Sequence, residues 1–253
     1  MQWKKTRCGR QRNDPGHTAS VFNTGVFPRS VPGQKDRGGG WRRPVKSAVV
    51  LVGGEARRAN GQEKYFFTYR GRTFIERLVD SLRQVVDEII LVARDPEQCK
   101  RFSSLGGIRC ITDIRTGIGP IGGLHAGSLA ARGDLIFVSA CDMPCIDSEV
   151  IRYLFDQIDN YDAVIPRWNP DMLEPLHAVY RRTALIRYLE SHNSLSLREM
   201  VLNLSARYIT VDEIRSIDPE LLTFTNINKL EDLEHINSPG SKSHKSPTSR
   251  KNL

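Results

Sequence analysis

Short apolar runs alternate with amphipathic segments through the first two thirds of this chain, and this alternation limits the possible folds more than any other feature. The apolar runs predict strands at 47–52, 88–93, 108–112, 134–140 and 161–166, and the amphipathic segments predict helices at 73–85, 95–103, 122–132 and 147–158. Alternation with short connections is typical of a mainly parallel sheet covered by helices on both faces. We therefore expect a single α/β domain with three layers, α/β/α.

Side-chain spacing supports these assignments. Between residues 73 and 85, Ile75, Leu78, Val79 and Leu82 recur at intervals of three and four, which gives a helix with one apolar face. The segment 134–140 lacks polar alternation, which predicts a central strand buried on both faces. Beyond residue 166 the pattern is less regular, and we expect a cap over the sheet edge. It would contain strands 175–180 and 207–211 and helices 183–190, 195–202 and 229–236.

The basic charge of the chain belongs to its ends. Residues 1–46 contain eleven Lys and Arg against two acidic residues, and residues 238–253 contain four basic residues and no acidic one. The stretch 47–237 therefore carries a net charge of −5, although the whole chain carries +8. Both ends are rich in Gly, Pro, Ser and basic residues, which predicts disordered tails around one domain at 47–237. Basic arms can bind RNA, but a solvated extension is the simpler interpretation.

Apolar segments and cysteines indicate the compartment. No apolar run approaches the roughly 20 residues of a membrane span, and the N-terminus lacks the apolar stretch of a signal peptide, so we expect a cytoplasmic protein without membrane contact. The five cysteines contain no C-x-x-C pair, so neither a disulfide framework nor structural zinc is expected. Cys141 and Cys145 are interpreted as reduced cysteines beside a buried strand.

The loop after the first predicted strand has the residues of a phosphate-binding loop. Gly53 and Gly54 allow backbone amides to approach a polyphosphate, and Arg58 and Lys64 can neutralise its charge. The loop is not a Walker A motif, because Tyr65 follows Lys64 where Ser or Thr is required. A glycine turn followed by a solvated basic loop is the alternative.

Two aspartates follow predicted strands at what should be the same edge of the sheet. Asp142 comes after the strand 134–140 and is the best candidate ligand for Mg²⁺, which prefers carboxylate oxygen together with substrate phosphates. The alternative for Asp142 is a helix N-cap, although Asp147 or Ser148 suits that position better. Asp113 ends the strand 108–112 and either contacts the same nucleotide or serves as a turn residue.

Two further motifs carry less weight. Residues 117–122 match G-x-G-x-x-G, but four residues separate them from the preceding strand, and Pro120 removes a backbone donor, so a dinucleotide site is disfavoured. His177 has no His or Cys at metal-ligand spacing and is interpreted as a satisfied, semi-buried histidine.

Taken in order, several motifs resemble the molybdenum cofactor guanylyltransferase family, over about residues 47–236. The motifs are Leu51-Val52-Gly53-Gly54 with Arg57, Arg58 and Lys64; Asp113 with 119–124; Cys141-Asp142-Met143-Pro144; Glu174-Pro175-Leu176-His177-Ala178; and Phe224-Thr225-Asn226-Ile227-Asn228. The resemblance implies a Rossmann-like, GT-A-type nucleotidyltransferase that joins GMP from GTP to molybdopterin with Mg²⁺ and releases pyrophosphate. Transient contact with molybdoenzyme maturation proteins is a further implied partnership. The sequence departs from the family pattern at Val52, at Ala59-Asn60 and at Lys229.

Residue roles follow from this resemblance position by position. Residues 51–54 and Lys64 correspond to the GTP-binding loop, Asp113 to a nucleotide contact, and Asp142 to the ligand of Mg²⁺ and GTP. Asn226 and Asn228 match a motif near the acceptor. In-line attack by a phosphate oxygen needs positioning and charge neutralisation, and we assign these to Arg58, Lys64 and Asp142.

Three alternatives remain open at this point. A sister nucleotidyltransferase would use CTP, or a sugar phosphate or phospholactate acceptor. A dehydrogenase built on residues 117–122 would bind NAD without needing Mg²⁺. A nucleic-acid-binding protein would use the basic tails and show steep salt dependence.

Overall fold

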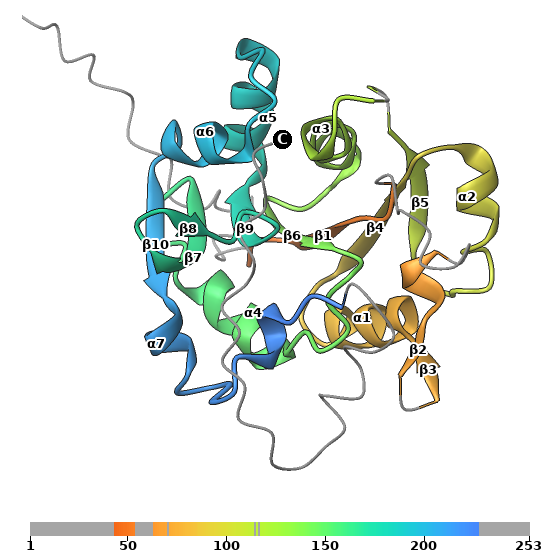
Figure 1. Cartoon of the computed structure of the whole chain (residues 1–253). Helices are drawn as coiled ribbons and strands as arrows, with labels where there is room; N and C mark the ends of the chain where they lie inside the picture. The colour runs from red at the N-terminus through yellow and green to blue at the C-terminus, as the bar shows by residue number, and fades with distance from the viewer. Residues whose placement is uncertain (1–42, 54–62, 70, 114, 116, 228–253) are drawn as a thin grey trace, which may run out of the picture. The chain divides into compact units, whose positions relative to one another are not determined.

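A twisted, mostly parallel sheet forms the centre of the protein. The computed structural model describes residues 43–53, 63–69, 71–113, 115 and 117–227. Within these residues the sheet has the order β10-β7-β9-β6-β1-β4-β5, with β8 paired to β7 (Figure 1). Its strands are β1 (Lys46–Leu51), β4 (Glu88–Ala93), β5 (Arg109–Thr112), β6 (Leu135–Ala140), β7 (Ala163–Asn169), β8 (Met172–Leu173), β9 (His177–Arg181) and β10 (Ala206–Thr210).

Helices cover both faces of the sheet, which confirms the predicted three-layer α/β/α architecture. On one face lie α3 (Pro120–Ala130), α5 (Arg182–Ser191) and α6 (Leu197–Leu202), and on the other lie α1 (Phe74–Arg83), α4 (Ser148–Asp156) and α7 (Val211–Ile214) (Figure 1). Successive residues of β1 point to opposite faces, so Val50 packs in the α1–α4 layer and Val49 in the α3–α5 layer. The expected amphipathic helix is α1, which a Thr73–Glu76 capping box begins.

Smaller elements complete the fold. The short helix α2 (Pro96–Lys100) contacts β4 and β5. Before α1 come a 3-10 helix, η1 (Lys64–Phe66), and a hairpin of β2 (Thr68–Tyr69) and β3 (Arg72–Thr73), and near the C-terminus lies η2 (Leu222–Phe224). The sequence pattern did not predict these short elements, because two or three residues are too few to establish a periodicity.

The expected cap beyond residue 166 is wrong in one respect. The predicted strand 175–180 is β9, which lies inside the sheet and pairs antiparallel with both β6 and β7. The Ala178, Val179 and Tyr180 side chains are fully buried, which an edge position would not allow. The predicted helix 229–236 lies outside the described residues.

Residues 43–46, just before the predicted domain start at residue 47, contact the rest of the described structure. Lys46 opens β1, and its backbone N–H donates to Asp87 Oδ2 at 2.9 Å. Arg43 forms an ion pair with the same carboxylate. These contacts connect residues 43–46 to the turn before β4. Residues 1–42 and the predicted C-terminal tail 238–253 lie outside the described part of the chain.

A disulfide joins Cys99 in α2 to Cys110 in β5, contrary to the expectation from cysteine spacing. The two residues are 11 apart in sequence, and their Cα atoms lie 5.6 Å apart because α2 packs against β5. No sequence motif marks this pair, since it depends on how helix and strand pack. The described residues contain no cluster of three metal-ligating side chains of the His, Cys, Asp or Glu type.

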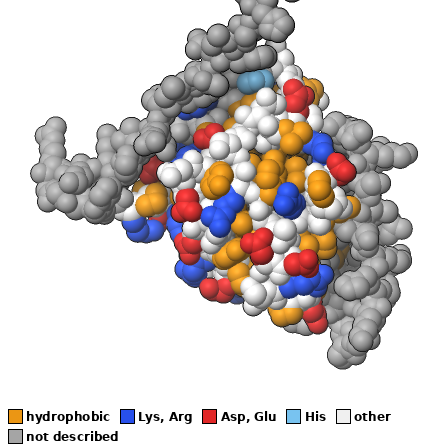
Figure 2. Space-filling view, turned by 90° about the vertical axis from the view of Figure 1, so that its left-hand side faces the viewer, with side chains coloured by type: hydrophobic (Ala, Val, Ile, Leu, Met, Phe, Trp, Pro, Cys, Tyr) orange, Lys and Arg blue, Asp and Glu red, His pale blue; other side chains and the backbone are white. Residues whose placement is uncertain are grey.

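Acidic and basic side chains are intermixed on the side of the molecule that carries β10 and α7, with scattered apolar side chains between them (Figure 2). Such mixing is typical of an ordinary solvated surface. Within the described residues, none of the helices has the length and apolar character needed to cross a membrane.

Candidate active site

The carboxyl ends of four neighbouring strands meet at one edge of the sheet. In the strand register, Leu51 lies opposite both Val92 and Ala140, and Ala93 lies opposite Thr112. Backbone hydrogen bonds extend this alignment past the strand ends, from Asp113 N to Ala93 O at 2.8 Å and from Cys141 N to Leu51 O at 3.3 Å. The segments that carry Gly53, Asp113 and Asp142 therefore leave the sheet side by side, as the sequence predicted.

Gly53 occupies a position without room for a side chain. A Cβ atom on Gly53 would lie 2.7 Å from Arg94 N and 2.9 Å from the carbonyl carbon of Ala93, which are both backbone atoms. Val52, just before it, is buried in the core and donates its N–H to Val92 O at 3.0 Å. Val52 thus anchors the start of the loop. Gly54, Arg58 and the Lys64 side chain lie outside the described residues.

Asp113 lies against the first turn of α3. Its Oδ1 accepts a hydrogen bond from Arg115 N at 2.8 Å, and a Cβ on Gly122 would meet both carboxylate oxygens at 2.9 Å. Helix α3 begins with Pro120 after Gly119, which has φ 74°, and no side chain caps it within the described residues. Gly117 and Gly119 therefore supply the positive φ angles of this loop, and Gly122 leaves room for the Asp113 carboxylate. The loop separates α3 from β5, unlike the immediate turn of a dinucleotide fingerprint.

Asp142 and Asn226 supply two buried oxygens at this edge. Ile227 N donates to Asp142 O at 3.0 Å, which connects the segment after η2 to the end of β6. Among the described residues, neither Asp142 Oδ1 nor Asn226 Oδ1 has a hydrogen-bond partner. Buried carboxylate and amide oxygens without partners fit a hard divalent cation. Asn228 lies outside the described residues.

The alternative role for Asp142, a helix N-cap, belongs to its neighbour. Asp147 caps α4 through a hydrogen bond from Glu149 N to its Oδ1 at 2.7 Å. The sequence interpretation of Asp147 as the cap is confirmed. Asp142 is therefore not needed for that position.

His177 holds the segment that carries Asn226. Its ring lies between those of Phe137 and Phe224, at centroid distances of 5.2 and 4.9 Å, and its Nε2 lies 3.3 Å from Thr223 Oγ1. The histidine is fully buried rather than semi-buried, and burial lowers its pKa to about 3. It is also not fully satisfied, because its Nδ1 has no hydrogen-bond partner among the described residues. His177 is thus a neutral packing residue beneath the site.

This burial predicts a pH-dependent stability. Unfolded His177 has a pKa near 6.5. The contribution of the buried, neutral ring to the free energy of unfolding is therefore complete above pH 6.5 and is lost as the pH falls from 6.5 towards 3. The slope is at most ~1.4 kcal/mol per pH unit for a single group. We expect His177→Gln to unfold with a shallower dependence on pH than the wild type between pH 7.5 and pH 5, measured by urea denaturation. Parallel curves for the two proteins would contradict this.

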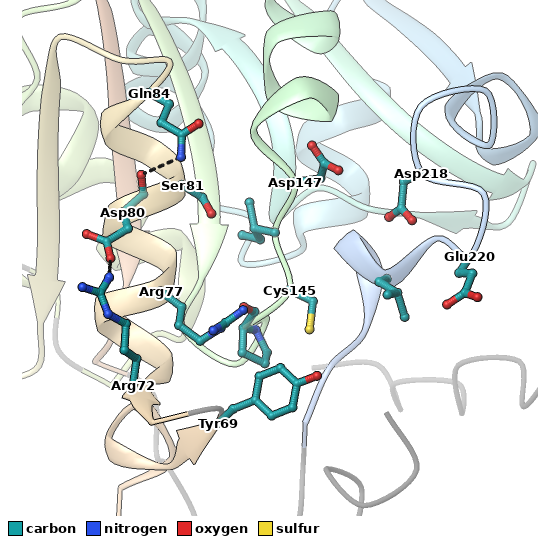
Figure 3. A pocket seen from close by; sticks show the side chains of 13 residues that line it. Tyr69, Arg72, Arg77, Asp80, Ser81, Gln84, Cys145, Asp147, Asp218 and Glu220 are labelled. Atoms are coloured by element: carbon teal, nitrogen blue, oxygen red, sulfur yellow. Dashed lines mark hydrogen bonds and ion pairs between the residues drawn. The ribbon is translucent and has the colours of Figure 1, made fainter. Parts of the chain in front are cut away.

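A pocket of about 520 Å³ lies between α1, the segment 144–147 and the segment 218–222 (Figure 3). Three of its four carboxylates are engaged in the fold: Asp80 pairs with Arg72, Asp147 caps α4, and Asp218 accepts from Thr223 N at 2.8 Å, while Glu220 has no such partner among the described residues. Arg77 donates from Nε to Pro144 O at 3.4 Å. Because most of these groups already have structural partners, the sheet edge that carries Asp142 and Gly53 is the better candidate site.

Comparison with known proteins adds an independent line of evidence. Residues 48–207 match the family model of the MobA-like NTP transferase domain. A probable molybdenum cofactor guanylyltransferase of Methanosarcina acetivorans is 41% identical over 205 residues, which cover 77% of this chain and 91% of that protein. The molybdenum cofactor guanylyltransferase of Desulfosudis oleivorans is 34% identical over 192 residues, covering 74% and 92% of the two chains.

A solved structure agrees with these relatives. The crystal structure of molybdopterin-guanine dinucleotide biosynthesis protein A from Archaeoglobus fulgidus superimposes with a TM-score of 0.63 at 32% identity. The match covers 75% of this chain and 95% of that protein. The similarity therefore includes nearly the whole of the solved relative.

Proposed function

This chain belongs to the MobA-like NTP transferase family, and on that basis we propose that it transfers GMP from GTP to molybdopterin with release of pyrophosphate. It is a nucleotidyltransferase, as its relatives are. The observation that carries the proposal is the pair of unpartnered buried oxygens on Asp142 and Asn226, beside the loop that starts at Gly53. The names of the relatives support the choice of base and acceptor.

Asp142 is our proposed ligand for Mg²⁺, with Asn226 Oδ1 as a second oxygen. Bound there, Mg²⁺ supplies positive charge that offsets the charge on the nucleotide phosphates. The loop 51–54 receives the phosphates through backbone amides. Gly53 lets the start of this loop lie directly against the backbone of Ala93 and Arg94. Arg58 and Lys64 neutralise the charge on the α-phosphoryl group as it is attacked.

The remaining residues position the two substrates. Asp113, at the first turn of α3, contacts the nucleotide, and Asn226 and Asn228 hold the acceptor. The nucleophile is a phosphate oxygen, which is already ionised near neutral pH. The protein therefore needs no general base, and the reaction depends on in-line orientation of the acceptor and the α-phosphorus.

We also propose that the protein works in the cytoplasm and delivers its product through transient contact with molybdoenzyme maturation proteins. The chemistry of the product supports the delivery step, because a dinucleotide cofactor acts only after insertion into an enzyme.

An assay of purified protein with molybdopterin, Mg²⁺ and each of ATP, CTP, GTP and UTP tests the function. We expect pyrophosphate release with GTP, dependent on both the acceptor and Mg²⁺. Release with CTP alone, or with a sugar phosphate or phospholactate as acceptor, would identify a sister nucleotidyltransferase. Binding of NAD without transfer would favour a dehydrogenase, and salt-sensitive RNA binding without transfer would favour a nucleic-acid-binding protein.

A further inference from the structure

Gln98 in α2 is a buried polar side chain that connects two distant parts of the chain. Only 1% of the surface of this residue is exposed to solvent. The Nε2 atom donates to Val52 O at 3.0 Å and to Tyr65 Oη at 3.1 Å. The Oε1 atom accepts from Arg94 N at 2.7 Å. Each hydrogen-bonding group of this amide therefore has a partner.

The two acceptors of the Gln98 amide lie at opposite ends of one loop. Val52 precedes Gly53, and Tyr65 follows Lys64, so the amide connects the start and the end of the segment 53–64. We propose that Gln98 is a positioning residue that fixes Val52 against Tyr65, positions the backbone at Gly53 and thereby sets the affinity for the nucleoside triphosphate. The inference rests on the proposed function, since it takes Gly53 as part of the phosphate-binding site.

Contacts around Gln98 support this role. Glu63, within the same loop end, pairs with Arg101 and with Arg94, which flank α2, and it also accepts a hydrogen bond from Tyr65. Helix α2 is itself fixed in place. The Asp95 side chain accepts from Gln98 N at 2.7 Å, and the disulfide of the next residue, Cys99, ties the helix to β5. The end of the loop thus rests on an anchored element.

The physical reason for an effect on binding is preorganisation. The Gln98 amide fixes Val52 and Tyr65 relative to each other before the nucleotide binds, so the backbone at Gly53 does not have to be ordered on binding, and such ordering otherwise reduces affinity. Gln98→Glu preserves the shape of the side chain and its Oε1 acceptor but replaces the Nε2 donor with an oxygen. Val52 O then faces a carboxylate oxygen without a hydrogen between them, so the hydrogen bond that joins Val52 to α2 is lost.

The test measures GTP affinity by calorimetry with Mg²⁺ and no acceptor, and then kcat and KM in the transfer assay. We expect Gln98→Glu to raise both Kd and KM for GTP about tenfold or more, while kcat changes by less than about threefold, as the loss of hydrogen bonds used for ground-state binding predicts. Gln98→Met removes the amide without adding charge and should also raise the Kd for GTP. It replaces Gln98→Glu in the test if the Glu variant does not fold.

Ser47→Ala is the matched control. Ser47 is fully buried, and its hydroxyl donates to Glu88 at 2.8 Å and accepts from Gly133 N at 3.0 Å. It lies near the start of β1, at the edge of the sheet opposite the loop. The control should lose thermal stability, as the Gln98 variants do, and keep the wild-type Kd for GTP.

A double-mutant cycle isolates the bond to Tyr65. Tyr65→Phe removes the hydroxyl that Gln98 contacts, so its effect on Kd should be smaller in the Gln98→Met background than in the wild type. Equal effects in both backgrounds, or Gln98 variants that bind GTP as the Ser47→Ala control does, would overturn the inference and leave the proposed function intact. If the wild type binds another nucleoside triphosphate instead, the Gln98 variants are compared with that nucleotide. In that case only the assignment of GTP as the substrate is wrong. A wild type that binds none of the four overturns both.

Discussion

Asp142→Asn is expected to lower turnover by a factor on the order of 10² or more, in line with the loss of a group that stabilises charge in a transition state. The Asn side chain has nearly the same size but lacks the negative charge that a hard dication requires. The residual activity should therefore need a much higher Mg²⁺ concentration. Because Asp142 Oδ1 has no hydrogen-bond partner among the described residues, the thermal midpoint should change little. Turnover measured against Mg²⁺ concentration tests this prediction.

Asp147→Asn provides the control for that experiment, since it makes the same chemical change five residues away. Asp147 caps α4, and Asn is as good a cap as Asp, so this variant should retain wild-type turnover and Mg²⁺ dependence. Superimposable Mg²⁺ curves for Asp142→Asn and the wild type would remove Asp142 from the metal site.

Gly53→Ala should lower kcat/KM by a factor on the order of 10², because a displacement of about 1 Å in a substrate-positioning group has effects of that size. The new methyl group would lie 2.7 Å from Arg94 N. Relieving this contact requires the backbone at residue 53 to move away from the end of β4, which displaces the start of the proposed phosphate-binding loop. The measurement is steady-state kinetics with GTP as the varied substrate, together with the thermal midpoint of each variant.

Gly106→Ala is the matched control for Gly53→Ala. A Cβ at Gly106 would meet nothing within 4 Å, and this glycine is not among those with positive φ. The change should leave both kinetics and stability close to those of the wild type. If Gly53→Ala behaved like Gly106→Ala, the start of the loop would not be as closely packed as we describe.

Local pattern was sufficient for the scaffold. The run before Gly53 and the run before Asp142 consist of apolar residues, and both became neighbouring parallel strands, β1 and β6. Because parallel strands end at a common edge, the order of apolar run and polar residue also predicted that Gly53, Asp113 and Asp142 would meet. The resemblance to a family added Asn226, whose position no periodicity indicates.

Pairings between distant segments depended on the tertiary structure. The segment 175–180 has the composition of a strand, but its insertion between β6 and β7 follows from packing on two buried faces. The disulfide between Cys99 and Cys110 arises where a helix meets an edge strand, and no spacing rule marks it. Gln98 appeared in the sequence as an ordinary residue of a short helix, and only its burial between Val52 and Tyr65 gives it a role.

The sequence by itself determined the three-layer α/β fold, the strand ends that carry Gly53, Asp113 and Asp142, and the family, because side-chain periodicity and local motifs are properties of neighbouring residues. The tertiary structure decided which oxygens lie unpartnered beside Asp142, how deeply His177 is buried, and what holds the loop at Val52 and Tyr65. These depend on contacts between segments far apart in the chain. These contacts form only when the whole fold buries and hydrogen-bonds the groups involved, so no short stretch of sequence predicts them.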